Sequence, residues 1–334
     1  ILHDMAKLII KTASGCLLGH EIRAKLDDSV ADIYHDLDGG FTPMQFMFEW
    51  LPLPSYYKRD AAHKKMSDLF YDIVQERRKS EKQNDDVVDA LMRNSYKDGT
   101  MMTDRQVAHM MIALLMGGQH TSSTTSSWTL LLLAQNPEIQ EELLKEQKEV
   151  FGEDLKDLTL DGLKKCTLLE SCIKETLRMR PPIINVMRYV KQNCEIPNTS
   201  YVIPQGYYVM SAPIITQLDE KCFPNAESYL PKRWLDPSIA AGTNKTPTEN
   251  VIEEHVWATM NSSSARSSYL PFGAGRHRCV GEQFAYMQIS TIISVILRNY
   301  RIKLNTEAGF PNINFATLIC SPLDPNLIEY EPRN

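Results

Sequence analysis

The sequence has 334 residues, 43% of them hydrophobic and 23% charged, which is the composition of a globular protein with a large buried core. It excludes a disordered chain, a collagen-like repeat and a disulfide-stapled mini-protein. Lys and Arg number 36 against 42 Asp and Glu, giving a net charge of −6, so the basic excess of a nucleic-acid-binding protein is missing.

The cysteines are odd in number and include no C-x-x-C pair, which argues against a disulfide framework and against a zinc ribbon. We expect at most one of them to carry chemistry and the others to be packing thiols. The seven are Cys16, Cys166, Cys172, Cys194, Cys222, Cys279 and Cys320.

Helices interrupted at prolines are predicted for the first hundred residues. The breaks fall at 41–43 and 51–54, because proline lacks an amide donor and excludes the preceding residue from helical geometry. Thr103, with Gln106 three residues later, forms a capping box. It opens a helix that we expect to run to Gln135.

Shorter elements are predicted for the rest of the chain. Two helices are expected over about 138–150 and 166–180, and a last one from about 280. Between them, 200–203 and 207–210 alternate like short strands. The predicted fold class is therefore mainly α with minor β. No run approaches the roughly 18 apolar residues of a membrane span.

The most informative segment is 271–281, Pro-Phe-Gly-Ala-Gly-Arg-His-Arg-Cys-Val-Gly. This glycine-rich loop can lie against a flat group, since Gly275 and Gly281 carry no side chain and Phe272 can pack on a ring. Three basic residues before Cys279, and the positive end of the following helix, favour its thiolate, which is a good ligand for iron. The alternative is a buried, inert cysteine in a tight turn.

Phe272, Gly275, Cys279 and Gly281 match the pattern F-x-x-G-x-x-x-C-x-G, so the loop resembles the haem-binding loop of the cytochrome P450 superfamily. The resemblance implies haem b with Cys279 as the axial thiolate on its iron. His277 stands where most members have arginine, and it could still bond a haem propionate. The implied cofactor-binding residues are Cys279, Phe272, Gly273, His277, Arg188 and Gly281, with Cys279 as the metal ligand.

A pair of charged residues supports the same family. Glu175 and Arg178 are spaced i, i+3 on one helix face, although such a pair on a surface is worth only about 0–1 kcal/mol. The spacing resembles the E-x-x-R helix of the superfamily, and Arg233 supplies the arginine that completes a buried cluster there. The resemblance implies a structural role and no chemistry for these three residues.

Gly117 and Gly118, followed by a run of hydroxyl side chains, make a poor helix interior that costs about 1 kcal/mol per glycine. Thr121 could bond an i−4 carbonyl or hold water, and a close helix crossing is the alternative. The stretch resembles the oxygen-activating helix of the superfamily. His120, where most members have Asp or Glu, is typical of sterol 14α-demethylases. Thr121 is then the candidate for the proton path, with His120 as a second donor or relay.

Other segments resemble the same narrower family, in its fungal form. They are 34–43, 183–188 with Arg188 as a propionate partner, and 269–279. The sequence starts without Met, and the resemblance implies that 1–334 is a single catalytic domain that lacks its N-terminal third, with any membrane anchor expected in the missing part. The implied substrate-pocket residues are Phe41, Met116, Gly117, Ile183, Val186 and Ile319.

The resemblance implies a haem monooxygenase of ergosterol biosynthesis. Three successive oxidations would remove the 14α-methyl group of a lanosterol- or eburicol-type sterol, using O2 and electrons from NADPH through NADPH-cytochrome P450 reductase. The expected location is the endoplasmic reticulum membrane, with the catalytic domain facing the cytosol. Azole inhibitors are expected to bind and nucleic acid is not. Two alternatives stay open: a haem-thiolate monooxygenase acting on another lipid or xenobiotic, and a non-catalytic paralogue or remnant.

Overall fold

The structure is a computed structural model that describes residues 1–26, 33–34, 36–37, 39, 48, 50–80, 84–196, 199–236 and 268–333. The chain divides into two compact units, one of residues 1–134 with 302–331, the other of residues 135–301 with 332–334. Helices dominate and the strands form three two-stranded sheets, which confirms the prediction of a mainly α fold with minor β.

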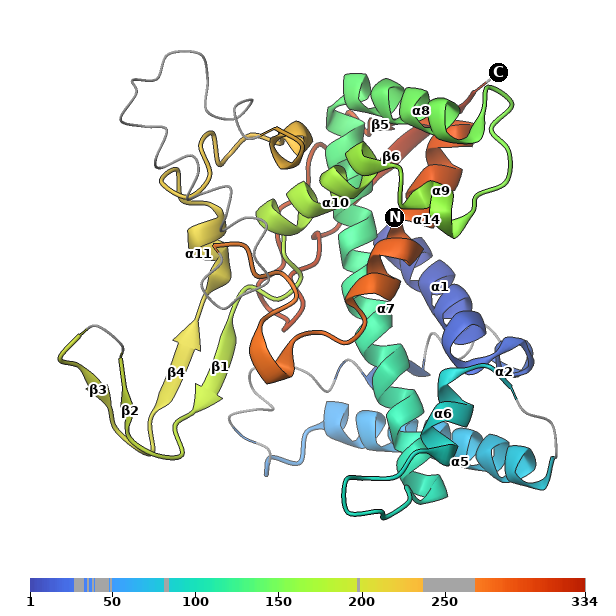
Figure 1. The fold of residues 1–334 in the computed structure, drawn as a ribbon, viewed down its shortest axis with the longest axis vertical. Helices are drawn as coiled ribbons and strands as arrows, with labels where there is room; N and C mark the ends of the chain where they lie inside the picture. Colours follow the sequence, from blue (N-terminus) through green and yellow to red (C-terminus); the bar gives the residue numbers. More distant parts are fainter. Residues whose placement is uncertain are drawn as a thin grey trace. The chain divides into compact units, whose positions relative to one another are not determined.

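Helices form most of the first unit, and its long helix starts as the sequence predicts. The Thr103 amide donates to Gln106 Oε1 (2.8 Å), and the Gln106 amide donates back to Thr103 Oγ1 (3.3 Å), so the capping box is present. The elements of this part are α1 (Leu2–Ala13), the π-helical turn η1 (Ser14–Leu18), α2 (His20–Lys25), α5 (Pro54–Lys79), α6 (Val87–Arg93) and α7 (Asp104–Gln135) (Figure 1).

A buried arginine on α5 ties the helices of the first unit together. Arg77 Nε donates to Glu21 Oε1 and its Nη1 to Asp86 Oδ1, both at 2.8 Å. Its Nη2 donates to the Leu18 carbonyl at 2.8 Å. One guanidinium thus bonds α2, the cap of α6 and the end of η1, which fixes the approach of these elements.

The second unit is built around α8 (Pro137–Phe151), α10 (Thr167–Met179) and α14 (Glu282–Asn299), which pack on one another (Figure 1). These helices confirm the three predicted for this half of the chain, with ends within two residues of the prediction. Its shorter helices are α9 (Leu160–Leu163), α11 (Pro213–Gln217), η2 (Pro231–Trp234) and η4 (Gly275–His277).

Two of the three sheets are antiparallel strand pairs. In the first, β1 (Val186–Tyr189) pairs with β4 (Tyr208–Ser211), with Val186 opposite Ser211; in the second, β2 (Cys194–Glu195) pairs with β3 (Val202–Ile203). The strand predicted at 200–203 is therefore two residues long. The third sheet consists of β5 (Tyr300–Leu304) and β6 (Ile328–Pro332).

The inward face of α14 is set by its middle and last turns. The buried apolar residues there are Ile289, Ile292, Ile293 and Leu297. The residues toward the start of the helix are less covered, since Phe284, Ala285 and Met287 are only half-buried, as is Ile296 near its end. Met287 instead lines a cavity beside the segment that precedes the helix.

A buried carboxylate on α10 is the polar centre of the second unit. Glu175 and the guanidinium groups of Arg178 and Arg233 are fully buried. Glu175 Oε1 accepts from Arg178 Nη2 (2.9 Å), Arg233 Nε (3.0 Å) and the Leu230 amide (3.1 Å). Its Oε2 accepts from Arg178 Nε (3.0 Å) and Trp234 Nε1 (2.9 Å). The structure thus brings together the three residues of the E-x-x-R cluster.

The two guanidinium groups of this cluster also donate hydrogen bonds to backbone carbonyls. Arg178 Nη1 donates to Gln217 O (2.8 Å), and Arg233 Nη1 donates to Pro224 O (2.7 Å). Burial lowers the pKa of Arg233, and attraction to Glu175 offsets part of this effect. Two buried cations therefore depend on one buried carboxylate.

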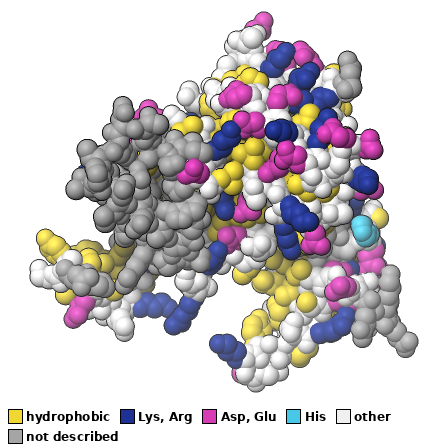
Figure 2. Space-filling model, turned by 45° about the horizontal axis from the view of Figure 1, so that its top comes forward, with side chains coloured by type: hydrophobic (Ala, Val, Ile, Leu, Met, Phe, Trp, Pro, Cys, Tyr) yellow, Lys and Arg dark blue, Asp and Glu magenta, His cyan; other side chains and the backbone are white. Residues whose placement is uncertain are grey.

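In the described part of the chain, no helix is both long and apolar enough to cross a bilayer. Basic and acidic side chains are interspersed on the face seen in Figure 2. Many of them form exposed pairs, such as Lys232 with Glu142 at 2.7 Å. Such exposed pairs contribute little to stability.

Replacing the buried carboxylate should destabilise the protein strongly. Glu175→Gln removes the one negative charge between two buried cations, so we expect the free energy of unfolding to fall by about 3–5 kcal/mol in urea denaturation. The matched control is Glu142→Gln, which breaks the exposed pair and should change that free energy by about 0–1 kcal/mol. Equal losses in the two variants would contradict this account of the cluster.

Candidate functional site

The loop before α14 presents Cys279 at the surface. Its turn is closed by backbone hydrogen bonds, from the Cys279 amide to Phe272 O (2.9 Å) and from the Gly273 amide to Leu270 O (3.2 Å). Gly273 and Gly275 have φ of +70° and +69°, a region that side chains rarely adopt. The sequence therefore needs glycine at both positions to turn the backbone so that the thiol is left exposed.

The other cysteines lie in different surroundings. Burial raises the pKa of Cys166 to about 11 and also raises the pKa values of Cys172, Cys222 and Cys320, so these thiols stay protonated. None of the seven, all within the described residues, is in a disulfide. Cys16 and Cys194 are exposed, so the expectation that all six others are packing thiols is wrong for these two.

The residues of the loop fit a haem group. A side chain at Gly275 would meet no described heavy atom within 4 Å, and one at Gly281 would stand 3.9 Å from the Cys279 sulfur. The exposed thiol thus has glycine beside it, as a planar ring system lying on the loop requires. No group of three or more His, Cys, Asp or Glu side chains in the described chain could hold a metal ion. A haem iron needs no such group, since the porphyrin supplies its other ligands and one thiolate suffices.

Phe272 is half-buried and lies against α14, where its ring centroid is 5.4 Å from that of Tyr286. Sequence reasoning missed Tyr286 and the ion pair of Arg278 with Glu282 (2.6 Å). The spacing of positions 282 and 286 was the available signal for Tyr286, because residues four apart share a helix face. The Arg278 guanidinium is therefore already paired with the Glu282 carboxylate.

The remaining cofactor candidates of the second unit are exposed. His277 ends the short helix η4 and is open to solvent. Arg188 lies on β1, and its Nη1 donates to the neighbouring Met187 carbonyl at 2.8 Å. No hydrogen bond joins the side chains of Arg188 and His277, both of which lie within the described chain. The structure therefore leaves both side chains available to an acidic group, and does not bring them together.

In the first unit, the middle of α7 carries the other candidates. A Cβ built on Gly117 or Gly118 would meet no described heavy atom within 4 Å, so the helix has open space there. Thr121 is half-buried, and its hydroxyl donates to the Gly117 carbonyl at 2.8 Å. His120 is also half-buried, and its carbonyl accepts from Ser123 Oγ at 3.2 Å.

The hydroxyl bond of Thr121 is the first of a series. Thr125 Oγ1 donates to Thr121 O at 2.8 Å, and Thr129 Oγ1 donates to Thr125 O at 2.7 Å. Bonds of this kind back to the i−4 carbonyl let a hydroxyl lie in a buried helix without an outside partner. Thr125 and Thr129 are buried, whereas Thr121, at the glycine end of the series, is not fully covered.

The predicted substrate-pocket residues are spread over both units. Met116, Gly117 and Ile319 belong to the first unit, in which Met116 and Ile319 are half-buried. Ile183, which is 42% exposed, and the half-buried Val186 belong to the second. Phe41 lies outside the described residues, as does most of segment 34–43.

Comparison with known proteins gives one family. A family model described as cytochrome P450 matches residues 3–329. A sterol 14-alpha demethylase of Aspergillus flavus is 43% identical over 332 residues, 98% of this chain and 66% of that protein. Lanosterol 14-alpha demethylases of Cunninghamella elegans and Bos taurus are 45% and 43% identical, over 98% and 99% of this chain and 64% and 61% of those proteins. The chain thus spans less than two thirds of the length of these curated relatives.

A solved structure agrees with this family. The structure described as retinoic acid bound cyanobacterial CYP120A1 superposes with a TM-score of 0.80 at 19% identity, covering 99% of this chain and 69% of that chain. A likeness at this identity concerns the fold, and it confirms the fold expected from the cysteine loop. Members of the cytochrome P450 family, whose model matches this chain, carry a haem iron held by a cysteine thiolate. The exposed cysteine, the fold and the match over residues 3–329 agree, and the chain belongs to the cytochrome P450 family.

Proposed function

We propose that the protein of which this chain is part is a sterol 14α-demethylase. The observation that carries the proposal is the 43–45% identity, over almost all of the chain, to proteins named sterol or lanosterol 14-alpha demethylase. His120 beside Thr121 on α7 supports the proposal, because a histidine at this position is typical of sterol 14α-demethylases. The reaction is the oxidative removal of the 14α-methyl group from a lanosterol- or eburicol-type sterol.

We propose Cys279 as the thiolate that holds the haem iron. When bound, the haem supplies the activation of dioxygen, and a thiolate ligand favours O–O cleavage. Cys279 is exposed at the end of a turn that two positive-φ glycines and the Phe272 carbonyl hold in place. Phe272, Gly273 and Gly281 shape the surface around the sulfur, and we assign His277 and Arg188 to the haem propionates.

We propose that Thr121 passes protons to the oxygen chemistry and that His120 is a second donor. The Thr121 hydroxyl donates to Gly117 O, which leaves its oxygen lone pairs to accept a bond from water. The open space beside Gly117 and Gly118 gives room for such a water or for substrate. We assign Phe41, Met116, Gly117, Ile183, Val186 and Ile319 to the apolar wall that would contact the sterol.

We propose further that residues 1–334 belong to one catalytic domain, since the family match covers residues 3–329. Electrons would come from NADPH through a separate NADPH-cytochrome P450 reductase, as membership of the cytochrome P450 family implies. The endoplasmic reticulum membrane is the proposed location, since a sterol substrate partitions into lipid.

The cofactor ligand can be tested by a cysteine replacement. We expect the reduced, CO-bound full-length protein to show the red-shifted Soret band of thiolate-ligated haem, and Cys279→Ala to abolish this band because it removes the sulfur. Cys194→Ala, at another exposed cysteine of the same unit, is the matched control and should keep the band. A band that persists in Cys279→Ala would overturn the assignment.

The substrate can be tested with sterols. Lanosterol or eburicol added to the ferric full-length protein should give a saturable type I spectral shift, because an apolar ligand displaces water near the iron. With reductase and NADPH, the product should be the 14-demethylated sterol and formate. A sterol that already lacks the 14α-methyl group should give no formate. Absence of both shift and product would favour action on another lipid or a xenobiotic.

The role of Thr121 predicts a selective loss of turnover. We expect Thr121→Ala to lower the demethylation rate by about 10- to 100-fold while leaving the sterol-induced shift intact. General acid–base catalysis contributes roughly 10²–10⁴-fold to a rate, and the loss stays at or below the low end of that range because His120 remains. Thr125→Ala removes a buried hydroxyl with the same i−4 bond and should keep the wild-type rate. Equal losses in both variants would assign the effect to helix structure.

A further inference from the structure

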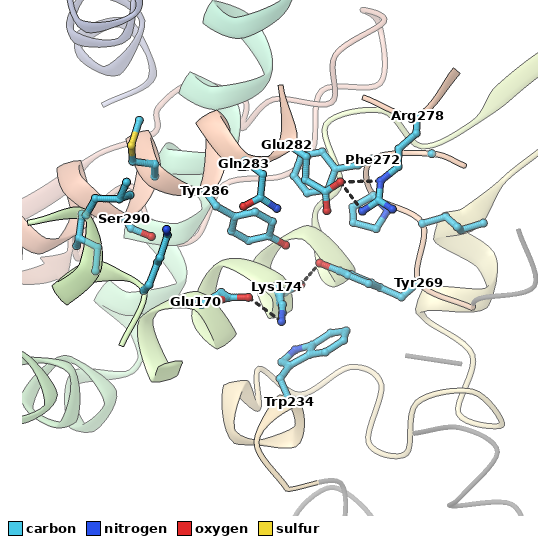
Figure 3. A pocket seen from close by; sticks show the side chains of 17 residues that line it. Glu170, Lys174, Trp234, Tyr269, Phe272, Arg278, Glu282, Gln283, Tyr286 and Ser290 are labelled. Atoms are coloured by element: carbon cyan, nitrogen blue, oxygen red, sulfur yellow. Dashed lines mark hydrogen bonds and ion pairs between the residues drawn. The ribbon is translucent and has the colours of Figure 1, made fainter. Parts of the chain in front are cut away.

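A cavity in the second unit has no place in the chemistry above. It lies behind the Cys279 loop, between the first turns of α14, α10 and the end of η2, and has a volume of about 280 Å³ (Figure 3). Its lining includes four aromatic side chains, those of Phe272, Trp234, Tyr269 and Tyr286, among aliphatic and charged residues. In Figure 3 the hydroxyls of Tyr269 and Tyr286 point toward one another.

The aromatic walls are held rigidly. The Trp234 and Tyr269 ring centroids are 4.6 Å apart, and Trp234 Nε1 donates to the buried Glu175 carboxylate. Tyr269 OH donates to the Lys174 carbonyl at 3.2 Å. Burial raises the pKa of Tyr286, and the Tyr286 hydroxyl shares a side-chain hydrogen bond with that of Tyr269. A preformed pocket of this kind binds with a small ordering cost.

The charges that line the cavity do not balance. Lys174 pairs with Glu170 at 2.8 Å, and Arg278 pairs with Glu282 at 2.6 Å, so both carboxylates are matched. Lys164, at the end of α9, also lines the cavity and has no ion pair with any described residue. The Lys164 ammonium is thus an exposed positive charge without an unpaired opposite charge among the described residues of the cavity lining.

From these features we infer that the cavity is a binding site for a compact aromatic anion, such as a carboxylate on one or two fused rings. The rings would pack against the aromatic side chains of the lining, and the carboxylate would pair with Lys164. The volume lies just below the roughly 300–1,000 Å³ of sites for drug-sized ligands, which limits the ligand to this size. The inference does not depend on which substrate the haem serves.

The site would also touch the haem-binding loop. Phe272, Gly273 and Arg278 line the cavity and belong to the loop that presents Cys279. A ligand there would therefore rest on the same backbone that positions the sulfur, from the side of α14.

The test uses 2-naphthoate as the probe and the full-length, haem-loaded protein. Calorimetric titration should show saturable binding of one probe per protein. The neutral 2-naphthamide should bind at least about tenfold more weakly and the cation 2-naphthylmethylammonium more weakly still, because the excess charge is positive. No saturable binding, or equal binding of anion and cation, would overturn the inference.

Two variants place the probe in this cavity. Lys164→Glu reverses the unmatched charge and should weaken 2-naphthoate binding at least about tenfold. Gln283→Trp, at an exposed residue of the lining, should fill the cavity and abolish binding. Lys165→Glu makes the same charge change one residue away, outside the lining, and should leave the affinity unchanged. Equal weakening by Lys164→Glu and Lys165→Glu, or full binding to Gln283→Trp, would refute the site.

Discussion

One buried carboxylate organises the second unit of this chain. Glu175 receives five hydrogen bonds from side chains and backbone that lie up to 59 positions away in the sequence. A buried ion pair is weak evidence for stability in general, because desolvation offsets the attraction. Here every lone pair that could be left unmatched has a donor, so the cluster fixes where η2 lies against α10 rather than merely neutralising charge.

From this cluster a series of contacts leads to the loop that carries Cys279. Trp234 bonds Glu175 on one edge and packs against Tyr269 with its ring. Tyr269 lies three residues before Phe272, whose carbonyl accepts a hydrogen bond from the Cys279 amide. The proposed iron ligand is therefore held by a packed path that begins at a salt-bridge cluster. The same path forms the aromatic walls of the cavity behind the loop.

The parts of this fold that could be predicted are those encoded by short spacings. The capping box of Thr103 and Gln106 marked the start of α7, and the glycine–cysteine pattern marked the loop before α14. Both depend on residues within one or two turns of each other. The donors that Trp234 and Leu230 give to Glu175 could not be predicted, because the intervening chain sets those contacts. The cavity could not be predicted for the same reason, since its lining comes from five separate segments.

The two exposed cysteines outside the haem-binding loop have a consequence for the handling of the protein. A thiol at the surface is open to oxidation and to disulfide exchange with other molecules, whereas a thiol bound to iron is not. Cys16 and Cys194 are exposed and free, so disulfide-linked oligomers of this chain would form through these two residues, and a reductant or their replacement by serine would suppress them.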